Sequence, residues 1–182
     1  MTPATPLTPA LPTRLAILVA AVALLVGCAP DPVPTPTPTA AFASEEEAFA
    51  AAEATYRAYN DALNSVDLSD PATFDAAFAL SSGNFNASDR RTLSKLHADG
   101  DSMVGSVTVS KFVGVNSAPP FREVVAYACV DVSASDVLNS SGASVVDPAR
   151  PDMNSLRVTF ILSGDQLLID HAARDENAEC PA

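Results

Sequence analysis

Residues 44–66 read SEEEAFAAAEATYRAYNDALNSV, and they set the architecture of the chain. Ser44 and Glu47 form a capping box, the sequence signature of a helix start, and the glutamates of the first turn suit the helix dipole. Apolar side chains then recur every three or four residues, which predicts a long helix with one apolar face. The members of that face are Phe49, Ala52, Tyr56, Tyr59, Leu63 and Val66.

Two shorter helices are expected after this one. Asp70 and Pro71 predict the first of them, because Asp caps a helix and Pro fits its first position. Ser88 is expected to cap the other, which ends at Gly100.

After Gly100 the apolar period changes from 3.6 to 2, which indicates strands. The first strand starts at Met103, and a bulge is expected near Lys111 because Phe112 falls on the other parity. Three more strands are expected over residues 123–133, 156–162 and 167–172.

The connections between these strands are also marked in the sequence. Gly164 and Asp165 suit a tight hairpin turn. Residues 139–151 form a polar loop, which is expected to enclose a short strand at 144–146. Helices followed by strands predict an α+β fold, in which N-terminal helices pack on a curved antiparallel sheet of about four strands.

The N-terminus carries an export signal. The apolar run Leu15–Val26 has twelve residues, fewer than the roughly 17–25 of a membrane-spanning helix and within the length of a signal-peptide core. Leu25-Val26-Gly27-Cys28 then matches a bacterial lipobox, which predicts that Cys28 takes acyl chains such as palmitate and becomes the first mature residue. The alternative is a plain cleaved leader in which Cys28 is incidental.

The segment after the leader predicts a spacer. Residues 29–39 read APDPVPTPTPT, and proline both fixes φ and lacks the amide hydrogen that a helix or sheet needs. We therefore expect a signal peptide over 1–27, a disordered Pro/Thr-rich stalk over 28–43 and one α+β domain over 44–182. The expected location is the extracytoplasmic face of the cell membrane, to which lipid anchors the protein.

The charge of the chain restricts its partners. Its formal net charge is −12, which argues against a nucleic-acid partner, because binding nucleic acid requires clustered positive charge. The expected partners are the membrane, through the lipid anchor, and an envelope protein or a small apolar ligand. A homodimer through the sheet is a further expectation.

Three cysteines are present, and Cys28 is assigned to lipid. Cys129 and Cys180 remain as an even pair in an oxidising compartment, so a disulfide that clamps the C-terminal tail to the sheet is expected. A reactive thiol or a metal ligand is the alternative, but neither a CxxC motif nor a nearby histidine supports it.

Few residues suggest catalysis. The chain lacks HExxH, GxSxG, phosphate-loop and SxxK motifs, and His97 and His171 are its only histidines. Asp131 is a candidate for acid–base chemistry if its strand turns it inward beside Tyr127 and His171. The alternative is a surface aspartate that is hydrogen-bonded to Ser133 or to the 139–147 loop. No catalytic residue, metal or cofactor is assigned.

Several stretches together resemble a known kind of protein. They are Cys129–Ser133, Arg150-Pro151, Leu156–Leu162 and Cys180, in a chain whose helices precede its strands. Over about residues 44–180 this pattern resembles small uncharacterised actinobacterial lipoproteins, which are similar to the NTF2-like (SnoaL-like) α+β fold. The resemblance implies a cone of helices and curved sheet with a pocket at its wide end.

The resemblance also suggests which side chains line that pocket. The candidates are Tyr56, Tyr59, Phe74, Phe78, Phe85, Tyr127, Asp131 and His171. The alternative is that the aromatic residues fill the core instead. SnoaL-like enzymes place Asp and His in the pocket, but no such pair can be matched residue by residue here.

Three functions are compatible with these observations. The first is a non-enzymatic envelope domain that binds a small apolar ligand or a protein. The second is a SnoaL-like isomerase or hydratase that uses the same pocket. The third is an accessory or inhibitor-like subunit of a secretion or cell-wall system.

Overall fold

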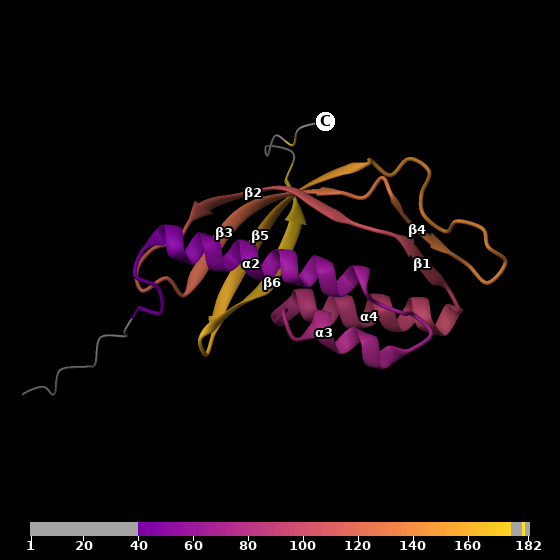
Figure 1. Cartoon of the computed structure of the whole chain (residues 1–182), viewed down its shortest axis with the longest axis horizontal. Helices are drawn as coiled ribbons and strands as arrows, with labels where there is room; N and C mark the ends of the chain where they lie inside the picture. The colour runs from indigo at the N-terminus through magenta and orange to yellow at the C-terminus, as the bar shows by residue number, and fades with distance from the viewer. Residues whose placement is uncertain (1–39, 176–179, 181–182) are drawn as a thin grey trace, which may run out of the picture. The chain divides into compact units, whose positions relative to one another are not determined.

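The computed structural model describes residues 40–175 and 180, so the leader, Cys28 and nearly all of the stalk lie outside the described residues. Helices come first along the chain and strands follow (Figure 1). The helical elements are α2 (Glu45–Asn64), η1 (Pro71–Phe74), α3 (Asp75–Phe78) and α4 (Gly83–Asp99). The strands are β1 (Ser102–Gly105), β2 (Thr108–Asn116), β3 (Glu123–Asp131), β4 (Ser135–Leu138), β5 (Met153–Ser163) and β6 (Gln166–Arg174).

Helix α2 begins at the predicted capping box. The amide of Glu47 donates to Ser44 Oγ at 3.2 Å, and the Glu47 carboxylate accepts from the amide of Ala43 at 2.7 Å. Ala48, Ala52 and Tyr56 of this helix are buried against the sheet. The prediction of a long amphipathic helix is confirmed.

The start of α4 differs from the sequence-based expectation. Ser82, not Ser88, is the cap residue, and the helix begins at Gly83. The Asp170 carboxylate of β6 lies against this helix end, where Ser82 Oγ donates to it at 3.1 Å. A Cβ at Gly83, which has a φ of +51°, would collide with that carboxylate. The helix start is thus stabilised by a residue from the last strand, which no local sequence signal reveals.

Four strands form an antiparallel sheet in the order β2-β3-β5-β6, as expected for the α+β class. The helices cover one face of it (Figure 1). Val124, Ala126, Ala128 and Val130 of β3 belong to the core on that face, so the alternate residues of this strand point to the opposite face. The register of β2 against β3 shifts between Val109 and Lys111, where the bulge was predicted.

The two remaining strands form a separate ribbon, β1–β4. β4 was not predicted, and the strand expected at 144–146 is wrong: Ser144 makes only an isolated bridge to Leu138. β1 followed by β2 forms one arm of a long hairpin, and β3 followed by β4 forms the other. The first arm bends between Gly105 and Thr108. Gly105 has a φ of +76°, and a Cβ there would collide with the carbonyl of Ala134. The bend turns the ribbon toward the C-terminal end of α2 (Figure 1).

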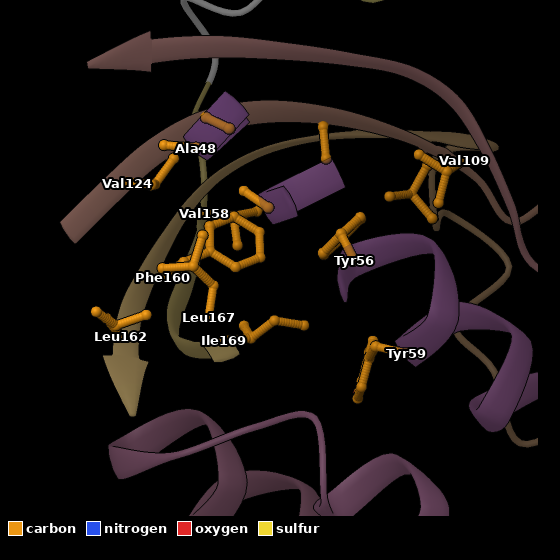
Figure 2. Packing of buried hydrophobic residues seen from close by; sticks show 14 of the residues in the cluster. Ala48, Tyr56, Tyr59, Val109, Val124, Val158, Phe160, Leu162, Leu167 and Ile169 are labelled. Carbon is orange, nitrogen blue, oxygen red and sulfur yellow. The ribbon is translucent and has the colours of Figure 1, made fainter. Parts of the chain in front are cut away.

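The main core lies between α2 and the sheet, and aromatic rings fill it. Tyr56 packs against Phe112 and Phe160, with ring centroids 6.0 and 6.4 Å apart, and Tyr59 packs against Phe85 at 5.3 Å. Figure 2 shows Tyr56, Tyr59 and Phe160 among the buried hydrophobic residues of this core. A second buried cluster joins the shorter helices, and its members are Leu68, Phe74, Phe78 and Leu93.

No helix within residues 40–175 combines the length and the apolar character that crossing a bilayer requires.

Candidate functional site

Two of the predicted pocket residues, Tyr56 and Tyr59, are part of the aromatic cluster and only 3% and 6% exposed. Burial raises the pKa of Tyr56 to about 12. The Tyr59 hydroxyl donates to Asp89 Oδ2 at 2.9 Å, and burial followed by the Asp89 charge raises its pKa. Both phenols are therefore neutral core groups rather than acids facing a ligand.

Phe74 and Phe78 lie elsewhere, in the second cluster. Their rings meet edge to face with centroids 6.2 Å apart, and the Arg90 guanidinium lies 4.1 Å above the Phe78 ring. Phe85 fills the main core beside Tyr59. These aromatic side chains fill space, which was the alternative to a pocket.

Tyr127, Asp131 and His171 lie on the sheet face that points away from the helices. Asp131 Oδ1 accepts from the amide and the hydroxyl of Ser133 at 2.9 and 2.7 Å, and these bonds lower its pKa. His171 is exposed opposite Thr159. The candidate pocket set is wrong as a set, because strand parity divides it between two faces of the sheet.

Cys129 and Cys180 form the expected disulfide, with Cα atoms 5.5 Å apart. Cys129 alternates with the core residues of β3, so the bond joins Cys180 to the same outward face. The prediction of this pair is confirmed.

A hollow that the sequence did not predict lies between the C-terminal end of α2 and the β1–β4 ribbon. This ribbon cleft has a volume of about 200 Å³. Its apolar wall is made of aliphatic side chains and one thioether: Leu63, Val66, Met103, Val104, Val107, Val132 and Val137. Asn64, Asp136 and Arg150 are its main polar side chains.

The walls of the cleft are held by side chains of α2. The Asn64 amide both donates to the carbonyl and accepts from the amide of Val107, each at 2.8 Å, as a neighbouring strand would. Nearer the start of the helix, Arg57 donates to the carbonyl of Val109 at 3.0 Å and pairs with Glu53. These contacts fasten the end of α2 to the bend of the long hairpin.

Arg150 stands at the rim of the cleft and is half-buried. Its Nη2 donates to the carbonyls of Val132 and Ser135 at 2.9 and 2.7 Å. Neither ion pair found between described residues includes Arg150, and no other hydrogen bond of its guanidinium is found there. Its Nε and Nη1 donors are therefore available to a ligand.

A second, larger hollow adjoins the cleft on the side of the 139–150 loop. This polar groove has a volume of about 510 Å³ and shares Ser135, Asp136 and Arg150 with the cleft. Asp147 and Asp152 also line it. Asp136 Oδ1 accepts from the amide of Val137 and from Ser144 Oγ, both at 2.7 Å, which fixes the carboxylate between the two hollows.

Sequence reasoning missed this site because its wall depends on β4, a four-residue strand without a readable alternation. The one local signal was the Arg150-Pro151 pair in a loop otherwise poor in basic residues. Within residues 40–175 and 180, no three His, Cys, Asp or Glu side chains are grouped to hold a metal ion.

No family model matches the chain, and no curated protein matches it. The fold resembles a proposed aromatic ring hydroxylase from Novosphingobium aromaticivorans, with 12% identity, a TM-score of 0.53, and coverage of 75% of this chain and 93% of that one.

Two other solved structures are more distant. The intermembrane-space region of chloroplast protein ARC6 has 12% identity, a TM-score of 0.49 and coverage of 69% and 95%. Aln2 from a Streptomyces species has 14% identity, a TM-score of 0.43 and coverage of 73% and 93%. Identities this low concern the fold alone. The domain has the expected NTF2-like α+β architecture, with helices packed on a four-stranded antiparallel sheet.

Proposed function

We propose that this chain is a lipid-anchored protein of the extracytoplasmic membrane face, whose domain binds a small, largely apolar molecule in the ribbon cleft. The anchor rests on the lipobox Leu25–Cys28, a feature of the sequence. The Cys129–Cys180 disulfide is consistent with an oxidising compartment.

The ribbon cleft is the observation that carries the binding role. Ligand sites are concave, mostly apolar and furnished with few polar groups, and the cleft combines seven apolar side chains with Asn64, Asp136 and Arg150. Each Å² of apolar ligand surface removed from water in such a site contributes about 25 cal/mol. An apolar molecule of a few carbon atoms would therefore gain enough from burial to bind measurably.

Binding is favoured over the isomerase or hydratase alternative. Acid–base catalysis needs a titratable pair that reaches the substrate. Asp131 and His171, the residues considered for it, lie on the far face of the sheet from the cleft. Within the described chain, Arg150 and Asp136 are the charged side chains at the cleft. A guanidinium keeps its protons in proteins, so it cannot serve as the partner of Asp136 in acid–base catalysis.

The binding role can be tested with 1-hexanol as an apolar probe and the unlipidated Cys28→Ala chain. We expect saturable NMR shifts at Val107 and Val137, two residues of the cleft wall. Val137→Phe should fill the cleft and abolish them. Val145→Phe is the matched control, because Val145 is 50% exposed and lines neither hollow. Equal binding by both variants, or shifts elsewhere only, would contradict the proposal.

The anchor needs a separate experiment. Wild-type protein should partition with membranes and carry acyl chains on Cys28 by mass spectrometry, whereas Cys28→Ala should be released. A Cys28→Ala chain that stays in the membrane fraction would refute lipid anchoring and leave the binding role to be judged by its own test.

A further inference from the structure

The ribbon cleft and the polar groove meet at three shared residues, Ser135, Asp136 and Arg150. The cleft is walled mainly by aliphatic groups, whereas serines, aspartates and the same arginine make up most of the groove lining, beside Ala134, Val146 and Pro148. A ligand that fills both must change from apolar to polar at Arg150.

We propose that the ligand is an amphiphile whose head carries several neutral hydroxyl groups, as a glycosyl unit does. Its short apolar tail occupies the ribbon cleft, and its head occupies the polar groove. This inference rests on the proposed binding function and names the ligand class.

The lining of the groove selects hydroxyl groups over charged ones. Arg150 offers N–H donors that described residues leave unused, and Asp136, Asp147 and Asp152 offer carboxylate acceptors. A hydroxyl is the group that both donates and accepts, so adjacent hydroxyls can satisfy both kinds of partner. An anionic head would face three carboxylates. A cationic head could pair with these carboxylates, but it would offer no acceptor to the unused N–H groups of Arg150.

Arg150 and Asp136 are held in place before any ligand arrives. The carbonyls of Val132 and Ser135 fix one edge of the guanidinium, which leaves its other donors oriented. The amide of Val137 and the hydroxyl of Ser144 both bind Asp136 Oδ1, and no described residue donates to Oδ2. Groups fixed in advance lose little conformational entropy on binding, which favours specific recognition of the head.

The test compares probes that share a six-carbon tail: 1-hexanol, hexyl β-D-glucoside, hexyl sulfate and hexylammonium. Affinities are measured by calorimetry with the unlipidated Cys28→Ala chain, below the concentration at which any probe forms micelles. Two or more new hydrogen bonds should make the glucoside bind at least about tenfold more tightly than hexanol. Both charged probes should bind more weakly than the glucoside.

Arg150→Gln and Asp136→Asn should each remove most of that glucoside advantage, because each lowers the affinity for the glucoside several-fold more than the affinity for hexanol. Arg91→Gln is the matched control, because Arg91 is exposed on α4 and lines neither hollow. Thermal unfolding of each variant separates recognition from folding. Should Arg150→Gln fail to fold, Asp136→Asn and the probe series still give the answer, since Asn can keep the bonds that Asp136 Oδ1 accepts.

Two failures are distinguishable. In the first, hexanol binds in the cleft, but the glucoside binds no more tightly or a charged probe binds best. This result overturns the proposal of a hydroxylated head and keeps the proposal that the cleft binds a ligand. Absence of cleft binding by every probe overturns both the head and the proposed function.

Discussion

Two regions under the same helix differ in how they are filled. Beneath the middle of α2, the rings of Tyr56, Phe112 and Phe160 pack against one another, and none of the three lines either hollow. At its C-terminal end, Leu63 and Val66 face a bent ribbon with smaller side chains, and a hollow remains. Side-chain size and the bend at Gly105, rather than the helix itself, determine which region is solid and which can receive a ligand.

The largest effect should come from emptying the solid region. Phe160 is fully buried between Tyr56 and Phe112, so Phe160→Ala should lower the free energy of unfolding by about 3–5 kcal/mol. Chemical denaturation measures it. Val137→Ala in the cleft wall should cost much less, because that wall already faces a hollow. Similar losses at the two positions would mean that the cleft is packed as tightly as the core.

Removing the disulfide tests whether a bond on the outward face of the sheet affects the stability of the core or binding in the cleft. Replacing Cys129 and Cys180 with alanine frees a segment whose ends are 51 residues apart, and this should lower stability by about 2–4 kcal/mol. Hexanol binding should persist at temperatures where the variant stays folded, because the bond lies on the opposite sheet face from the helices. Loss of binding by a folded variant would show that the tail shapes the cleft.

The filled region was the more predictable one. The capping box and the three-to-four spacing of apolar residues predicted α2, and alternation predicted β3, β5 and β6, because each pattern is local and repeats over many residues. The single strand expected from Met103 was wrong, since the structure divides it into β1 and β2 of two different sheets. The same spacing also suggested the alternative that the aromatic residues fill the core. Local periodicity is therefore enough to predict an element whose position depends only on which residues are buried.

The hollow region could not be predicted in the same way. β4 pairs with β1, whose residues lie 30 to 36 positions earlier in the chain, and the start of α4 depends on Asp170. The face of Asp131 depends on the strand register, and a shift of one residue reverses every side chain. Pairing, capping and parity of this kind are set by tertiary contacts, so only the structure reveals the cleft.

A third change should affect the bend that opens the cleft. Gly105→Ala places a side chain at a φ of +76° against the carbonyl of Ala134, and the left-handed conformation alone costs roughly 1–2 kcal/mol. We expect a loss of about 2 kcal/mol in the free energy of unfolding together with weaker hexanol binding.

Gly142 provides the matched control for the bend. It has a φ of +82°, but nothing lies within 4 Å of the position of an added Cβ. Gly142→Ala should therefore cost stability without weakening hexanol binding. If both variants lose binding equally, the bend at Gly105 is not what keeps the cleft open.

The smallest effect should be a pH dependence that distinguishes Asp89, a partly buried residue of α4, from Asp131 on the outward face of the sheet. Burial raises the pKa of Asp89, despite the bond from Tyr59, so its stabilising contribution is present at low pH and is lost as pH rises through the raised pKa. On the outward face, bonds from Ser133 lower the pKa of Asp131, so its contribution is present at neutral pH and is lost as pH falls through the lowered pKa.

Asparagine at the two positions should therefore give opposite signs. Asp89→Asn removes a charge that burial disfavours and can still accept from Tyr59, so near pH 7 this variant should be slightly more stable than wild type. Asp131→Asn should be slightly less stable, because the bonds from Ser133 favour the ionised form. Denaturation at about pH 7 and at about pH 3 measures both, and each difference should shrink at the lower pH as the wild-type carboxyl takes up its proton. Equal signs at neutral pH would contradict the opposite pKa shifts of Asp89 in α4 and Asp131 on the outward sheet face.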